Sequence, residues 1–133
     1  MQAAASFRRM ITGLGAVALV VGGVGILAIM LLSVKERTNE VGLRTAVGAR
    51  RRDIRTQFLV EAMMLGGSGG MVGVLAGIAV AWAVNATTQW SAVISGPAVA
   101  VAFGSALLIG IVFGVLPAQK AARLDPIESL RAE

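Results

Sequence analysis

Three apolar runs dominate the chain, and short polar segments separate them. Residues 11–34 and 99–117 contain no charged side chain, and residues 58–84 contain only Glu61. Each run is long enough for a helix that crosses the hydrocarbon core of a bilayer, which needs about 20 residues. Lipid offers backbone groups no hydrogen-bond partner, so a crossing segment must satisfy them within a helix. The pattern predicts an all-α membrane protein with three transmembrane helices.

The basic side chains predict the orientation of these helices. Seven of the twelve Lys and Arg residues lie in residues 35–57 and three lie in the tail, residues 118–133, whereas residues 85–98 have none. Two spans separate the basic segments, so both lie on one side of the membrane, which is cytoplasmic by the positive-inside rule. Residues 1–10 and 85–98 are then expected to be extracytoplasmic.

An alternative for the first apolar run is a cleaved signal peptide. Arg8 and Arg9 precede this run, as basic residues precede the core of a signal. The run is longer than a typical signal core and ends in Lys-Glu-Arg rather than at small residues. We therefore expect a transmembrane helix.

Composition excludes several classes of site. The 133-residue chain is 56% hydrophobic and only 14% charged, with no Cys and no His. Disulfides, thiol chemistry and the usual zinc ligands are excluded. The net charge of +5 lies beside apolar spans, which favours contact with membrane lipid over nucleic acid. The sequence predicts no catalytic, cofactor-binding or metal-binding residue.

Small residues recur at four-residue spacing in two of the predicted spans. Such spacing lets helices approach closely in lipid. Two readings stay open: packing among the three helices of this chain, or contact with a helix of a second subunit. The predicted helix-packing residues are Gly69, Gly73, Gly77, Gly110 and Gly114.

Glu61 is expected about one turn inside the second span, near the cytoplasm. Acidic side chains within the membrane are costly and often functional. At this depth Glu61 is expected to reach the interface or to pair with an arginine of the loop, in a structural or coupling role. A proton relay is the competing reading, but no other ionisable group lies deeper in the spans.

The polar loop is predicted to contain a short helix. Glu40 and Arg44 have the spacing of a helical ion pair, and Gly48 is a natural helix stop. The three arginines of residues 50–52 are expected to meet lipid headgroups, and Asp53 favours the start of the next helix. The simpler reading is a loop whose charges only anchor it and set topology.

The tail is predicted to form a short cytoplasmic helix. Pro117 is expected to end the third span. Asp125 and Pro126 then have the pattern of an N-cap and a first helical residue, with Glu128 in the first turn.

Long stretches of this chain resemble the permeases of MacB-type, or FtsX-like, ABC transporters. The segment SVKERTNEVGLRTAVGARRRDIRTQFLVEA closely resembles the signature loop of these permeases. The preceding VVGGVGILAIMLLSV is similar to the end of the helix that leads into that loop. The closing FGVLPAQKAARLDPIESLRAE is similar to the family's C-terminus.

The resemblance implies a permease of the bacterial inner membrane that works as a dimer with cytoplasmic ABC ATP-binding subunits. A coupling helix in the loop would dock on the ATPase, and ATP-driven closure would move it, for export or for mechanotransmission. ATP hydrolysis would belong to the partner. By this resemblance the docking segment is formed or framed by Glu36, Arg37, Glu40, Gly42, Arg44, Ala46, Gly48 and Ala49.

The chain also departs from the family pattern, which has four spans and a large extracytoplasmic domain between the first and second. This chain has three predicted spans and begins just before the second. A truncated product, a fragment of a fused permease or half of a split permease all fit, with an upstream permease segment as a further partner. The alternative function is a small membrane scaffold or regulatory protein that binds an ATPase without transport.

Overall fold

The computed structural model describes residues 2–87 and 93–124 and contains four helices in these ranges. They are α1 (Gln2–Glu36), α2 (Thr38–Ala46), α3 (Arg51–Thr87) and α4 (Gly96–Ala122). No strand occurs in the described ranges. The chain is therefore an all-α protein, as the hydropathy pattern predicts.

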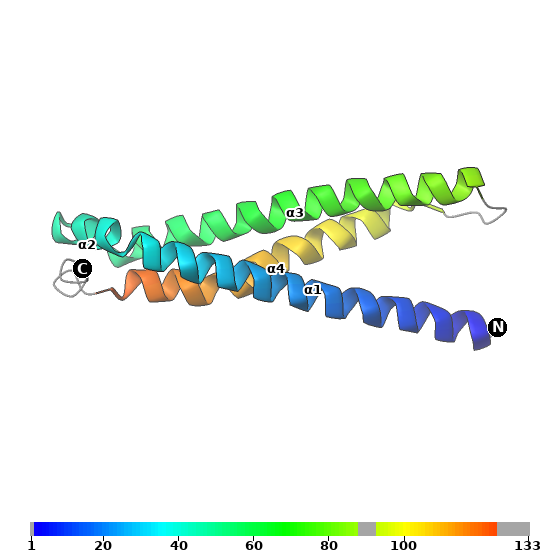
Figure 1. Cartoon of the computed structure of the whole chain (residues 1–133), viewed down its shortest axis with the longest axis horizontal. Coiled ribbons are helices and arrows are strands. Elements are labelled where there is room, and N and C mark those ends of the chain that lie inside the picture. The colour runs from blue at the N-terminus through cyan, green and yellow to red at the C-terminus, as the bar shows by residue number, and fades with distance from the viewer. Residues whose placement is uncertain (1, 88–92, 125–133) are drawn as a thin grey trace.

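The three long helices run along the long axis of the molecule, and the short α2 lies at one end (Figure 1). All three are long and apolar enough to cross a membrane. At about 1.5 Å per residue, a helix of 37 residues such as α3 is roughly 55 Å long, which exceeds a hydrocarbon core of about 30 Å. A helix of this length therefore extends beyond the core at one end or both.

Helix α4 lies between the other two long helices and packs against both, whereas α1 and α3 have few contacts. Figure 1 shows α1 diverging from α3 toward the N-terminus. The buried apolar cluster lies where all four helices meet, near α2. It consists of Met30, Val34, Val41, Ile54, Phe58, Ala62, Ala118 and Ala121. The bundle is thus closed at the α2 end and open at the other.

The contact between α3 and α4 is made by small residues that leave no room for a side chain. A Cβ on Gly66 would lie 3.0 Å from the carbonyl oxygen of Ala106 and 3.0 Å from the Cα of Gly110. A Cβ on Gly114 would overlap the Cβ of Ala62. Both helices have small residues every four positions here, and backbone-to-backbone approach follows from that spacing.

The helix of the third span does not stop at Pro117, the residue at which the span itself is expected to end. Helix α4 continues through Pro117 to Ala122. Proline removes one backbone hydrogen bond, which membrane helices tolerate where neighbours pack around the freed group. Pro117 is fully buried, and Ala118, Ala121 and Ala122 beyond it are buried too. This packing holds the last turn in a helical conformation.

Other expected boundaries also differ from the helix ends. Helix α1 begins at Gln2, so most of residues 1–10 is helical. Helix α3 ends at Thr87, three residues beyond the predicted span. The short helix predicted around Asp125 lies outside the described residues.

Candidate functional site

Helix α2 follows α1 after a break of a single residue, Arg37. The backbone hydrogen bonds continue across the break, from Arg37 N to Ser33 O at 3.0 Å and from Val41 N to Arg37 O at 3.0 Å. The Thr38 hydroxyl donates to the Val34 carbonyl at 2.9 Å and closes the same turn. The end of α1 and the start of α2 are therefore joined by a nearly continuous hydrogen-bonded backbone.

The other end of α2 is a Schellman turn that requires glycine. The Ala49 amide donates to the Arg44 carbonyl at 2.9 Å, and the Gly48 amide donates to the Thr45 carbonyl at 3.1 Å. Gly48 has φ +104°, a left-handed conformation that costs other residues about 1–2 kcal/mol. The glycine stop expected from the sequence is present, and it directs the chain into α3 within a few residues.

The inner face of α2 is buried against the start of α3. Val41 and Gly42 are buried, and Val41 belongs to the apolar cluster that also contains Ile54 and Phe58. Because Gly42 has no side chain, the α2 backbone can lie close to its neighbours at this position. Burial of this face fixes which residues of α2 point outward.

Two large apolar side chains lie on the outer face of α2. Leu43 is 56% exposed and Val47, at the C-cap, is 83% exposed. They are four residues apart and therefore lie on one side of the helix. Exposed apolar side chains are ordinary on the lipid-facing spans, but α2 lies in the most charged segment of the chain. Leu43 and Val47 form what we call the apolar patch of α2.

Polar side chains connect α2 to α3. Arg37 Nη1 lies 3.5 Å from Glu61 Oε2, and Arg44 Nη1 donates to Gln57 Oε1 at 2.9 Å. Arg44 also pairs with Glu40 at 2.5 Å within α2. Exposed ion pairs contribute about 1 kcal/mol or less, so these contacts set the position of α2 more than they stabilise the fold.

The structure thus places the predicted docking residues in different roles. Of the two expectations for Glu61, it shows pairing with a loop arginine, Arg37. Glu40 and Arg44 contact each other, and Arg44 also contacts α3. Of the remaining predicted residues, Gly42 is buried within α2. The others lie at or beyond helix ends: Glu36 at the end of α1, Ala46 as the last residue of α2, and Gly48 and Ala49 in the turn.

Sequence reasoning missed Leu43 and the role of Val47. One feature of the sequence could have pointed to them, because both are large apolar residues in a mostly polar segment. Val41 gives the same signal, however, and it is buried. Only the packing of α2 on α3 shows that Val41 points inward and that Leu43 and Val47 point outward.

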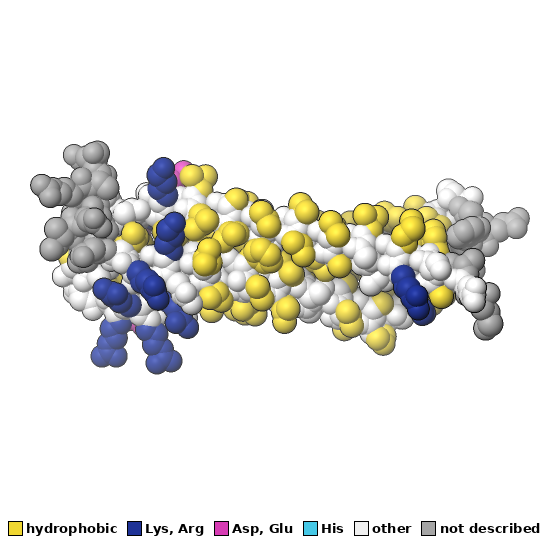
Figure 2. All heavy atoms as spheres, turned by 90° about the horizontal axis from the view of Figure 1, so that it is seen from below, with side chains coloured by type: hydrophobic (Ala, Val, Ile, Leu, Met, Phe, Trp, Pro, Cys, Tyr) yellow, Lys and Arg dark blue, Asp and Glu magenta, His cyan; other side chains and the backbone are white. Residues whose placement is uncertain are grey.

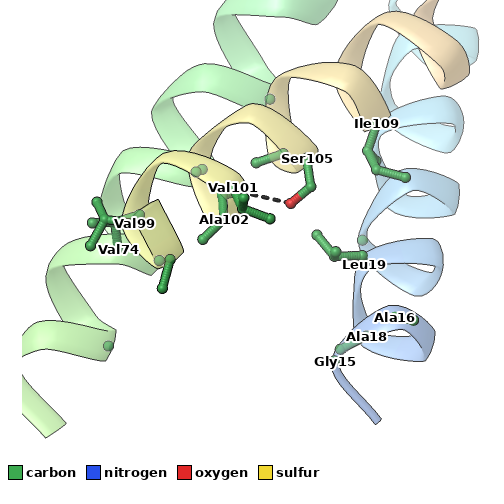
Figure 3. Close-up of a pocket in the computed structure, with 18 of the residues that line it drawn as sticks. Gly15, Ala16, Ala18, Leu19, Val74, Val99, Val101, Ala102, Ser105 and Ile109 are labelled. Atoms are coloured by element: carbon green, nitrogen blue, oxygen red, sulfur yellow. Dashed lines mark hydrogen bonds between the residues drawn. The ribbon is translucent and has the colours of Figure 1, made fainter. Parts of the chain in front are cut away.

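The open end of the bundle contains an apolar groove of about 970 Å³ between α1, α3 and α4 (Figure 3). Leu19 of α1 points across it toward Ala102 and Ser105 of α4, and the Ser105 hydroxyl donates to the Ala102 carbonyl at 2.8 Å. In the part of the chain that the structure describes, no charged side chain lines the groove. Its surface suits another apolar helix or lipid tails better than a polar substrate.

The predicted helix-packing glycines divide between this groove and the α3–α4 contact. Gly110 and Gly114 lie in the contact with α3. Gly69, Gly73 and Gly77 line the groove, and a Cβ on any of them would meet nothing within 4 Å. The α3 side of the contact is made by residues that sequence reasoning did not select, Ala62, Gly66 and Gly70.

Comparison with known proteins gives a consistent picture. Residues 12–126 match the model of the FtsX-like permease C-terminal family. The chain is 49% identical over 124 residues to the macrolide export ATP-binding/permease protein MacB of Bdellovibrio bacteriovorus, which covers 93% of this chain and 19% of that protein. It is 47% identical over 131 residues to the pyoverdine export ATP-binding/permease protein PvdT of Pseudomonas putida, covering 96% and 19%.

A third relative is the probable syringafactin export ATP-binding/permease protein SyfD of Pseudomonas syringae pv. tomato. It is 51% identical over 115 residues, which are 86% of this chain and 17% of that protein. The chain therefore spans about a fifth of the length of the curated relatives it matches. The family match covers the polar loop, most of α1, all of α3 and α4, and the tail as far as residue 126. The chain is a multi-pass protein of the bacterial inner membrane and belongs to the FtsX-like permease family, whose C-terminal region it contains.

Proposed function

We propose that this chain is the membrane-embedded, ATPase-coupled region of an ABC transporter permease. Helix α2 docks on a cytoplasmic ATP-binding protein through its apolar patch, Leu43 and Val47. The observation that supports this most is the exposure of two large apolar side chains on a short helix in the most charged part of the chain. Such a patch is typical of a surface that a partner covers.

The connections of α2 suit the transmission of movement. Its N-terminal end continues into α1 through Arg37, and its inner face is buried against α3. The contacts of Arg37 with Glu61 and of Arg44 with Gln57 add two polar links to α3. A displacement of α2 by an ATP-binding partner would therefore move the cytoplasmic ends of two membrane helices together.

The outer half of the bundle is the part free to respond. There α1 diverges from α3 (Figure 1), and the apolar groove lies between α1, α3 and α4. We assign the groove, with Gly69, Gly73 and Gly77, to packing against a further helix of the permease assembly. A second permease subunit and an upstream permease segment with its periplasmic domain are the two sources of such a helix.

The names of the relatives are relevant to the identity of the ATP-binding partner. Those proteins are ATP-binding/permease proteins, so in them the two activities are named for one polypeptide. For this chain we propose that ATP hydrolysis belongs to an ABC ATP-binding domain outside the described helices. The proposed outcome is export or mechanotransmission across the inner membrane.

Site-specific crosslinking tests the docking surface. A photo-crosslinking amino acid at Val47 should capture an ABC-type ATP-binding protein in native membranes, identified by its peptide sequence. The same group at Val80 of α3, which is 63% exposed on a membrane helix, serves as the control and should capture none. Equal capture at the two positions, or no ATP-binding protein at Val47, would refute docking through this patch.

A second measurement separates a permease from the alternative, a scaffold or regulatory protein. The captured ATP-binding protein is assayed for ATP hydrolysis with and without this chain in a reconstituted membrane. A coupled permease should change the hydrolysis rate. Capture at Val47 with an unchanged rate would favour the scaffold.

A further inference from the structure

We propose that a basic pocket between α3 and α4 binds the headgroup of an anionic phospholipid from the cytoplasmic leaflet. The pocket lies between the first turns of α3 and the last turn of α4 and has a volume of about 690 Å³. Arg51, Arg52 and Arg55 contribute to it from α3, and Arg123 contributes from the C-cap of α4. The proposal is independent of docking through α2, because none of these residues belongs to the apolar patch.

The charge of this pocket is not neutralised by the described part of the chain. Among residues 2–87 and 93–124, no carboxylate lines the pocket. The two ion pairs among the described residues are those of Arg37 with Glu61 and of Arg44 with Glu40, so none of the four pocket arginines takes part in one. Convergence of like charges is unfavourable unless an anion binds between them. Guanidinium groups match phosphate oxygens in geometry, so a phosphate is the favoured anion.

The pocket also has an apolar part, which distinguishes a lipid from a free anion. Leu59, within α3, and Ala122, the last residue of α4, line it beside the arginines, and both helices are long and apolar enough to cross a membrane. Figure 2 shows a large group of Lys and Arg side chains at one end of the molecule and a smaller group near the other, with the yellow apolar belt of the spans between them. A phospholipid places its phosphate at this level and its acyl chains against the apolar belt.

Two neutral polar side chains complete the lining. The Thr56 hydroxyl donates to the Arg52 carbonyl at 2.9 Å, which leaves its oxygen available as an acceptor. Gln119 from α4 is exposed at the pocket and supplies amide donors and an acceptor. These groups suit the hydroxyls of a glycerol headgroup, so phosphatidylglycerol is the natural probe.

The contribution of Arg123 distinguishes the pocket from a basic loop that only touches the membrane surface. It lies on a different helix from the other three arginines. A phosphate held by both sets would join the start of α3 to the end of α4. Arg51 and Arg52, two of the three arginines expected from the sequence to meet lipid headgroups, would then be part of a defined lipid site, and Arg50 would not.

The test is a lipid titration of the full chain in detergent, followed by native mass spectrometry. Phosphatidylglycerol should bind more tightly than phosphatidylcholine. Replacing Arg55→Gln or Arg123→Gln should weaken phosphatidylglycerol binding roughly fivefold each, the effect of one basic residue near a charged membrane surface. Arg50→Gln is the matched control, because Arg50 precedes α3 but does not line the pocket, and it should leave binding nearly unchanged.

Three outcomes would overturn the proposal. The first is equal binding of the two lipids, and the second is equal weakening of binding by Arg50→Gln and Arg123→Gln. The third is full displacement of the lipid by millimolar inorganic phosphate, because that result would show a site for a free anion. Arg123→Lys keeps the charge and guards against a misfolded variant. It should retain more binding than Arg123→Gln, and equal loss in both would also contradict the proposal.

Discussion

Arg37 and Glu61 form an ion pair, 3.5 Å between Nη1 and Oε2, that joins the break between α1 and α2 to the first third of α3. The two side chains are 48% and 33% exposed, so the pair contributes little to stability. Its position is more informative than its energy. It ties together the three helices whose relative movement the proposed coupling requires.

The first prediction concerns this pair. Glu61→Gln should lower the change in ATP hydrolysis that the chain causes in its partner, while the thermal unfolding midpoint moves little, since an exposed pair is worth about 1 kcal/mol or less. The exchange Arg37→Glu with Glu61→Arg should restore part of the effect. If the exchanged pair is no better than Glu61→Gln alone, the side chains do not act through each other.

A second prediction concerns the contact between α3 and α4. Gly110→Ala places a Cβ 3.0 Å from the Ala62 carbonyl oxygen and 3.1 Å from the Gly66 Cα, so the two helices must separate. We expect a loss of about 1–3 kcal/mol, typical of overpacking, read as a lower unfolding midpoint in detergent. Gly69→Ala is the control, because its Cβ would meet nothing within 4 Å. A similar loss in the two variants would contradict the assigned contact.

The turn after α2 gives a third prediction. Gly48→Ala forces a Cβ into a left-handed backbone conformation and should cost about 1–2 kcal/mol locally. Because this turn aims α2 relative to α3, partner binding should weaken as well. Gly25→Ala on α1 adds the same methyl group with free space around it and should change neither property. Partner binding unchanged by Gly48→Ala would show that the turn geometry is not needed.

Topology is the fourth prediction, and the absence of cysteine from the chain makes it simple to measure. A single Leu43→Cys should react with a membrane-impermeant thiol reagent only from the cytoplasmic side. Ala86→Cys, near the end of α3, should react only from the opposite side. Labelling of both positions from one side would contradict the predicted orientation and the docking of α2.

The sequence predicts the architecture well because hydropathy and helix-stop chemistry act locally. Three apolar runs lead to three long helices, and Glu40, Arg44 and Gly48 correctly indicate a short helix between the first two. These signals depend on residues within a few turns of one another. Pro117 is the exception, since packing around it overrides its local tendency to end a helix.

Which face of a helix meets which neighbour is not a local property, and there the sequence is ambiguous. Helix α3 has two series of small residues at four-residue spacing, one that includes Gly66 and one that includes Gly69. Only the packing shows that the series with Gly66 faces α4. In the same way, burial of Val41 decides that Leu43 and Val47 face outward. The outward pair, Leu43 and Val47, can be identified only from the folded structure. The same is true of the pocket to which Arg123 contributes.

The central claim is that α2 docks on an ATP-binding protein through Leu43 and Val47. The affinity of this chain for the ATP-binding protein captured at Val47 tests that claim most directly. Leu43→Ser with Val47→Ser should weaken binding roughly thirtyfold, since the loss of anchor residues at an interface costs about 2 kcal/mol or more. The matched control is Leu108→Ser with Val112→Ser, the same residue types at the same spacing, 61% and 56% exposed on α4. The account predicts weak binding for the first pair and unchanged binding for the second; equal affinities for the two double variants would contradict it.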